Sequence, residues 1–181
     1  MSSTASEIQL KGHVHLEHIR NGEVIGVYDF PNGVVNEGKN RLLDVMFDSG
    51  TQITSWYLGL IDNTGVTLAA DDIYDDINQA GNAWDEFTDY TDAANADSAL
   101  TRPLWTPGEP ASQSITNGTP VVFDITGTGT LHGLFLAGGT GADTKGNHAS
   151  TGVLWATAPF TGGNVPVADS DQIRATYTVS A

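Results

Sequence analysis

The segment from Ile53 to Asp62 reads ITSWYLGLID, and apolar residues occupy both of its alternating sets of positions. One set consists of Trp56, Leu58 and Leu60, and the other of Tyr57, Gly59 and Ile61. A strand with one face in solvent alternates apolar and polar residues, whereas a strand covered on both faces is apolar almost throughout. The segment is therefore predicted to be a central strand, with a second sheet over one face and a helix or loop over the other.

A β-hairpin is predicted before this strand, over residues 7–30. Asn21-Gly22 is a strong hairpin signal, because both central positions of a type I′ turn require a positive φ. Pairing outward from the turn places Leu16 opposite Val27 and Ile19 opposite Val24. The segment Phe30-Pro31-Asn32-Gly33 is expected to end the hairpin.

One α-helix is predicted, at about residues 37–48. Asn36 is its candidate cap, Glu37 lies in the first turn, and Gly50 follows its end. Apolar residues recur on one face at helical spacing, namely Leu42, Leu43, Met46 and Phe47. We expect this face to pack against the sheet, next to the central strand.

Strand patterns return after Leu104. Strands are predicted at 112–116, 121–126, 131–137, 153–158 and 173–179, with clean alternation in 121–126 and 173–179, and turn residues separate them. With eight to ten strands in all, the sequence predicts an all-β, antiparallel β-sandwich of the jelly-roll or Greek-key kind with one short helix. We divide the chain into an N-terminal arm, residues 1–6, and a single domain, residues 7–181.

An acidic excursion at about residues 66–100 interrupts the strand pattern. It holds nine carboxylates, and no Lys or Arg occurs between Leu42 and Thr101. Two apolar groups lie within it: Ile73, Tyr74 and Ile77, then Trp84, Phe87 and Tyr90. We interpret it as a large functional loop with a short strand near residues 86–91.

The composition narrows the classes of function. The 181 residues include 22 acidic and 7 basic ones, for a net charge of -15, and no cysteine. The charge repels nucleic-acid phosphates and anionic lipid heads, and the absence of cysteine excludes disulfides and thiolate chemistry. No apolar run approaches the roughly 20 residues of a transmembrane helix, and no Sec-type signal is visible. We expect synthesis in the cytoplasm and neither a nucleic-acid nor a membrane partner.

Two groups of residues invite a metal interpretation. His13 and His15 lie two residues apart on one predicted strand and therefore share a face. Asp89 and Asp92 belong to a loop that only loosely follows the spacing of calcium ligands. Polar residues on an exposed sheet face and a solvated acidic loop account for both groups, so no metal or other cofactor is predicted.

Motifs of catalysis are missing from the sequence. It contains neither G-x-S-x-G nor H-E-x-x-H, and Gly138-Gly139-Thr140-Gly141 lacks the Lys-Ser/Thr of a phosphate-binding loop. The prediction is a non-enzymatic protein. A glycosidase-like pair of loop carboxylates stays open as an alternative, because the separation of two carboxylates in space is invisible in a sequence.

Four tryptophans divide into two groups. Trp56 and Trp155 lie in strong strand patterns and are assigned to the core, whereas Trp84 and Trp105 lie in loop-like segments and suit a protein or carbohydrate contact. The candidate contact residues of the arm, the excursion and the segment after it are Ser2, Ser3, Thr4, Ile73, Tyr74, Trp84, Phe87, Tyr90 and Trp105.

Most of the chain follows a distinctive order of motifs. The hairpin leads to GVVNEGKNRLLDVMF at 33–47, ITSWYLGLID at 53–62, AWDEFTDY at 83–90 and TRPLWTPGEPASQSITN at 101–117. VVFDITGTGTLHGLFLAGG at 121–139, GVLWATAPF at 152–160 and DQIRATYTVS at 171–180 complete it. This order resembles that of small virion proteins of tailed bacteriophages, which decorate or cement the capsid.

The resemblance implies a β-sandwich that sits on the outside of a phage capsid, bridges neighbouring subunits and has no catalytic residues. The implied partner is the major capsid protein, with a homo-oligomer (dimer or trimer) on the shell of the virion. The N-terminal arm and the excursion are the expected contacts. A tail-associated receptor- or carbohydrate-binding β-sandwich module is the alternative.

Overall fold

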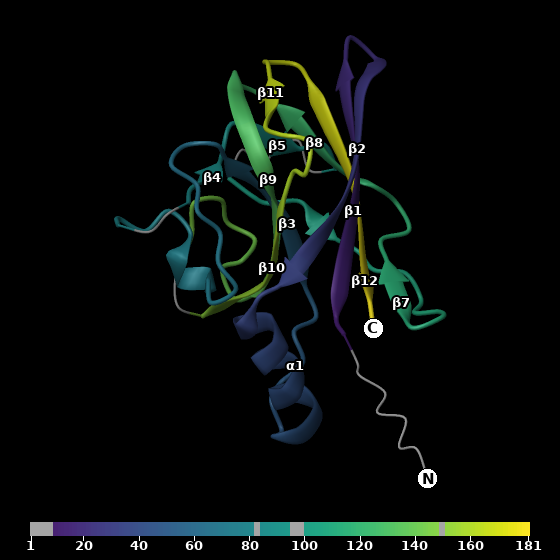
Figure 1. The fold of residues 1–181 in the computed structure, drawn as a ribbon, viewed down its shortest axis with the longest axis vertical. Coiled ribbons are helices and arrows are strands. Elements are labelled where there is room, and N and C mark those ends of the chain that lie inside the picture. Colours follow the sequence, from purple (N-terminus) through teal and green to yellow (C-terminus); the bar gives the residue numbers. More distant parts are fainter. Residues whose placement is uncertain (1–8, 82–83, 95–99, 149–150) are drawn as a thin grey trace.

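The computed structural model describes residues 9–81, 84–94, 100–148 and 151–181. Within these ranges the chain forms twelve β-strands, one α-helix and one short 3-10 helix (Figure 1). The first elements are β1 (Lys11–Arg20), β2 (Glu23–Val34), α1 (Asn36–Phe47), β3 (Trp56–Asp62), η1 (Tyr74–Asp76), β4 (Glu86–Phe87) and β5 (Tyr90–Asp92). They are followed by β6 (Leu104–Trp105), β7 (Ser114–Thr116), β8 (Val121–Ile125), β9 (Gly129–Gly139), β10 (Gly152–Pro159), β11 (Val165–Val167) and β12 (Gln172–Ser180).

The strands pair antiparallel and build the two layers of a sandwich. One layer has the order β2-β1-β12-β8-β5, with β7 beside β12. The other has the order β4-β3-β9-β10, with β6 on β3 and β11 on β9. Strand β2 joins the layers, because its Gly33 and Val34 pair with Thr157 and Ala156 of β10. The predicted all-β antiparallel sandwich with one short helix is confirmed, and its sheet is nearly closed.

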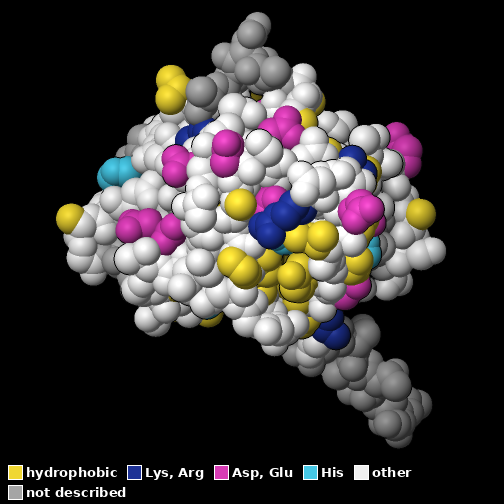
Figure 2. Space-filling view, turned by 90° about the horizontal axis from the view of Figure 1, so that it is seen from above, with side chains coloured by type: hydrophobic (Ala, Val, Ile, Leu, Met, Phe, Trp, Pro, Cys, Tyr) yellow, Lys and Arg dark blue, Asp and Glu magenta, His cyan; other side chains and the backbone are white. Residues whose placement is uncertain are grey.

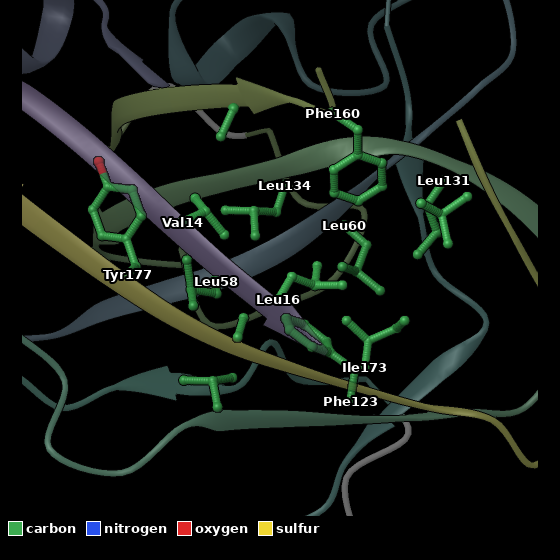
Figure 3. Close-up of a cluster of buried hydrophobic side chains, with 14 of the residues drawn as sticks. Val14, Leu16, Leu58, Leu60, Phe123, Leu131, Leu134, Phe160, Ile173 and Tyr177 are labelled. Carbon is green, nitrogen blue, oxygen red and sulfur yellow. The ribbon is translucent and has the colours of Figure 1, made fainter. Parts of the chain in front are cut away.

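The main core lies between these two layers. Alternate side chains of β1 and β12, among them Leu16 and Ile173, meet Leu58 and Leu60 of β3 (Figure 3). These four side chains are fully buried. Burying a side chain of this size contributes about 1.5–3 kcal/mol to the stability of the fold.

Strand β3 is covered on both faces, as its sequence predicts. Leu58 and Leu60 belong to the main core, whereas Ile61 belongs to a second apolar cluster on the outer face of the sheet. The acidic excursion completes that second cluster with Tyr74, Ile77 and Trp84. The cover over the outer face of β3 is therefore a loop segment.

The excursion also contributes two strands in place of the single one predicted near residues 86–91. Strand β4 pairs with β3, with Phe87 opposite Leu60, and β5 pairs with β8, with Tyr90 opposite Ile125. Because β3 and β8 belong to different layers, the excursion spans both of them at one edge of the sandwich.

The hairpin forms with the predicted turn and a shifted register. Asn21 and Gly22 have φ values of 53° and 79°, as a type I′ turn requires. Ile19 lies opposite Val24 as predicted, but a bulge next to Ile19 moves Tyr28 into the place expected for Val27, opposite Leu16. Strand β2 also continues through the segment expected to end it, as far as Val34.

Helix α1 departs from its prediction in two respects. Its cap is Val35 without a capping side-chain bond, so Asn36 is the first helical residue. The expected packing of its apolar face on the sheet is wrong, because Leu42, Leu43, Met46 and Phe47 are 36%, 55%, 64% and 82% exposed. Only the first turns contact the sandwich, with Gly38 against the backbone of Trp155, and the rest of the helix extends beyond the sandwich (Figure 1).

Leu60→Ala is expected to lower the free energy of unfolding by about 2–5 kcal/mol, because it leaves a cavity in a fully buried site. Leu100→Ala removes the same atoms from a side chain that is 72% exposed, and is expected to cost less than about 0.5 kcal/mol. Urea denaturation measures both values. Equal losses would contradict the location of the main core.

Candidate functional site

The first group of interacting charged and polar side chains is a buried ion pair beneath the excursion. Arg102 and Glu86 are 1% and 5% exposed. The guanidinium donates from Nε to Oε1 of Glu86 at 2.9 Å and from Nη2 to Oε2 at 2.8 Å. Glu86 lies in β4 and Arg102 lies just before β6, so the pair links the excursion to the segment that follows it.

The remaining donors of Arg102 also have acceptors. Its Nη1 donates to the hydroxyl of Tyr74 at 2.9 Å and to the carbonyl of Ala142 at 3.0 Å, and its Nη2 donates to the carbonyl of Asn147 at 3.0 Å. Glu86 in turn accepts a bond from the hydroxyl of Tyr90 at 2.9 Å. All five guanidinium N–H groups are thus engaged within the chain, which makes the pair a structural lock.

The protonation states in this lock are fixed. Burial lowers the pKa of Arg102, but the hydrogen bonds and charge of Glu86 outweigh it and hold that pKa above its usual value. Burial and the charge of Glu86 raise the pKa of Tyr90 well above its ordinary range. Arg102 therefore stays charged and Tyr90 stays a neutral donor, as a role in stability requires.

A second ionic cluster, in which Asp171 and His18 are buried and Arg20 is partly exposed, joins β1 to the start of β12. Asp171 is almost fully buried, and its carboxylate accepts bonds from Arg20 at 2.7 Å and shares one with Nε2 of His18 at 2.8 Å. The backbone N–H of Ala168 donates to the same carboxylate at 2.8 Å. The bonds from Arg20, more than those from the backbone and His18, hold the pKa of Asp171 well below its usual range.

The candidate metal ligands lie in two separate places. His13 and His15 both face Asp29 of β2, at 3.9 Å and 3.0 Å from its Oδ1, on an exposed part of the sheet. The carboxylate of Asp92 accepts the backbone N–H of Ala94 at 2.9 Å, and Asp89 lies in the turn between β4 and β5. Among the described residues, no three His, Cys, Asp or Glu side chains are placed to hold a metal ion.

Most of the candidate contact residues are core residues. Tyr74, Trp84, Phe87, Tyr90 and Trp105 are buried within the chain, so the expectation that they form a contact surface, or a sugar-binding platform, is corrected. The first four are buried because the excursion folds back on the sheet, and Trp105 is buried in β6, where it pairs with Trp56 of β3. Ile73 is 41% exposed, and Ser2, Ser3 and Thr4 lie outside the described residues.

Two surfaces of exposed apolar side chains lie at opposite ends of the molecule. The hairpin surface consists of Val24, Ile25 and Val27, which are 52%, 50% and 54% exposed, near the turn between β1 and β2. The helix surface consists of Leu42, Leu43, Met46 and Phe47 of α1. The hairpin turn and α1 occupy the two ends of the long axis in Figure 1. Figure 2 views the end that carries the hairpin turn, and hydrophobic side chains gather near the middle of that face.

Sequence reasoning missed both surfaces as sites. The pattern of the helix surface is the one that a core-facing helix shows, so it gives no signal of exposure. The hairpin offered a weak signal, because the neighbours Val24 and Ile25 point to opposite faces of a strand and only one face of a two-layer sandwich is buried. The ion pair of Arg102 and Glu86 left no sequence signal, since the two residues pair across 16 positions.

Comparisons of the chain with protein-family models, with curated proteins and with solved structures found no match. In the described part of the chain, no helix is both long and apolar enough to cross a membrane. The candidate site therefore rests on the geometry alone, which places exposed apolar side chains at the two ends of the sandwich.

Arg102→Met is expected to lower the free energy of unfolding by roughly 3–5 kcal/mol, because it leaves the carboxylate of Glu86 buried without its partner. The double variant with Glu86→Leu is expected to recover part of that loss. Arg174→Met, at an exposed arginine, is the matched control. Thermal or urea denaturation measures all three, and a single variant no less stable than the control would refute the lock.

Asp171→Asn is expected to change how stability depends on pH. The folded protein holds the pKa of Asp171 below the unfolded value of about 3.9, so its contribution is complete above that pH and is lost as the pH falls through the folded pKa. The variant is therefore expected to be less stable at pH 7 and to show a flatter decline below about pH 4. Asp169→Asn, its exposed neighbour, serves as the control. Parallel declines in all three proteins would contradict the assignment.

Proposed function

We propose that this chain is a non-enzymatic structural protein of a tailed-bacteriophage virion, which binds the outside of the capsid and stabilises it by bridging neighbouring subunits. Its partner is the major capsid protein, and it reaches the virion after synthesis in the host cytoplasm. The observation that carries the proposal is the pair of exposed apolar surfaces at opposite ends of the sandwich. The order of motifs that resembles phage decoration proteins supports it.

The placement of the two surfaces suits a bridge. Exposed apolar side chains gathered at one end of a soluble protein mark a contact site, and burying each one on a partner is favourable. Twelve strands and the lock of Arg102 and Glu86 hold the region between the surfaces rigid. A rigid body with a contact at each end transmits force between the proteins that it binds and loses little entropy on binding.

The charge of the chain suits a protein surface as partner. With a net charge of -15, the chain is repelled by nucleic-acid phosphates and by anionic membranes. The same charge keeps the free protein soluble although both apolar surfaces are exposed. Binding then rests on apolar contacts, which tolerate the salt of a host cell better than exposed ion pairs do.

Stabilisation of the capsid follows from mass action. A protein that binds neighbouring subunits together, and binds separated subunits weakly, shifts the equilibrium toward the assembled lattice. No reacting group is needed for this effect, in agreement with a fold whose buried ionic groups are engaged with one another.

A carbohydrate- or receptor-binding tail module is the second candidate, and one observation favours it. Trp56 and Trp155 meet edge to face at 5.9 Å and line a cavity of about 390 Å³ together with Gln52 and Trp105. Half-buried tryptophans beside a polar amide are a combination that sugars bind. This groove replaces the platform of Trp84 and Trp105 expected from the sequence.

The variant Val24→Ser/Ile25→Ser is expected to lower the affinity for capsids stripped of this protein at least about tenfold, because it removes most of the hairpin surface. Co-sedimentation with such particles measures it. Leu104→Ser, a similarly exposed apolar residue in β6 and outside both surfaces, is expected to bind like the unchanged protein.

Three results would count against the proposal or redirect it. No binding of the unchanged protein to the capsids would refute it. Equal binding of Val24→Ser/Ile25→Ser and the unchanged protein would remove the hairpin surface from it. Binding to a glycan array without binding to capsids would favour the second candidate.

A further inference from the structure

Helix α1 is anchored at its first turns only. Glu37 accepts bonds from the backbone N–H of Tyr74 at 2.9 Å and of Leu154 at 2.6 Å, and Gly38 lies so close to Trp155 that a Cβ would be 2.6 Å from its carbonyl oxygen. Beyond this point the helix leaves the sandwich (Figure 1). The four side chains of the helix surface consequently remain 36% to 82% exposed and would gain by further burial on a partner.

The helix surface forms one wall of a groove. Leu10 and Lys11, at the start of the described chain, and Ala181, at its end, lie on the other side of it. Lys39 precedes Leu42 and Leu43 by about one turn and continues the same stripe. The groove therefore combines the apolar side chains of the helix surface with two lysines, Lys11 and Lys39.

These two lysines stand apart from the other basic residues. Arg20, Arg41 and Arg102 have carboxylate partners, Lys145 donates to the carbonyls of Thr88 and Tyr90, and Arg174 donates to Gln172. Lys11 and Lys39 have no side-chain hydrogen bond or ion pair to any residue that the structure describes. The occupant of the groove should thus present apolar side chains together with negative charge.

The same helix in a second copy has both properties. Its last turn carries no basic residue, and Asp48 follows it, so its negative end is uncompensated. When two such helices pack antiparallel about a twofold axis, Lys39 of each copy approaches the last turn of the other. In this arrangement Leu43 meets Met46 and Leu42 meets Phe47, which joins apolar to apolar along the whole stripe.

The chain's own first residues are a poorer occupant. Residues 1–8 read MSSTASEI, and Met1 and Ile8 are the only large apolar side chains among them. Two such side chains, at the two ends of the segment, do not match a stripe of four on two successive helical turns. The chemistry of the groove favours the second copy.

We propose that two copies of this chain form a dimer through antiparallel packing of their α1 helices, with Lys39 of each copy at the C-terminal end of its partner's helix. The dimer leaves the two hairpin surfaces at its far ends. It therefore offers two equivalent contacts, and a ligand with two linked contacts binds a repeating lattice more tightly than a single one does. The dimer itself does not depend on the proposed function.

The mass of the purified chain in solution tests the dimer. Sedimentation equilibrium at concentrations from one to several hundred micromolar is expected to show a species of twice the 19.1 kDa mass of one chain. Leu43→Asp/Met46→Asp places charges in the stripe and is expected to be monomeric throughout. Val24→Asp/Ile25→Asp makes the same kind of change on the hairpin surface and is expected to remain dimeric. Circular dichroism confirms that both variants are folded.

Single cysteines test the orientation, because the chain has no cysteine of its own. A mixture of Leu43→Cys and Met46→Cys is expected to form mixed disulfides faster than either variant forms its own, since antiparallel packing brings position 43 of one copy to position 46 of the other. Faster homodisulfides would indicate parallel helices and overturn the geometry.

The dimer has its own contradicting results, separate from those for capsid binding. A monomer at several hundred micromolar would overturn it. So would dissociation caused by Val24→Asp/Ile25→Asp, which would indicate contact through the hairpin. A dimer with no capsid binding would leave this inference intact and refute the proposed function alone.

Discussion

Strand β3 has apolar side chains on both faces, and this requirement for two covers organises the molecule. Leu58 and Leu60 on one face are buried against the other layer of the sandwich. Ile61 on the other face is buried by Tyr74, Ile77 and Trp84 of the acidic excursion. A segment rich in aspartate covers an apolar sheet because most of its large apolar side chains point inward, whereas carboxylates such as those of Asp71, Asp85 and Asp89 are exposed.

The buried ion pair of Arg102 and Glu86 holds this covering segment against the sheet. The excursion contributes Tyr74, Glu86 and Tyr90 to the network around Arg102, and the segment after β9 contributes the carbonyls of Ala142 and Asn147. A buried ion pair of this kind favours one arrangement of the chain more than it lowers the free energy of the fold. Any alternative arrangement that separates the two residues leaves a buried charge without a partner. The aromatic side chains of the excursion are consequently used in folding, and the two groups of exposed apolar side chains lie at the ends of the sandwich.

The sequence predicted what depends on local periodicity. The alternation in β3, the turn at Asn21-Gly22 and the strand pattern near the C-terminus each follow from neighbours along the chain, and each is present in the structure. The sequence could not predict that α1 extends away from the sandwich, because an apolar stripe on a helix packs equally well against a sheet and against a second helix. The contacts of Trp84 and Trp105 were also missed, since loop-like composition does not reveal that a segment returns to the core. The contact between Asp29 and His15 could not be predicted from the sequence either, because it depends on how β1 and β2 pair.

We propose that the sandwich makes its contacts at its two ends and uses its acidic excursion as internal cover. A three-dimensional electron-microscopy reconstruction of capsids carrying this protein tests it most directly. We expect the hairpin surface to touch the shell and the helix surface to touch a second copy, with the outer side of residues 71–81 facing solvent. Density that places the excursion against the shell and leaves both ends in solvent would contradict it.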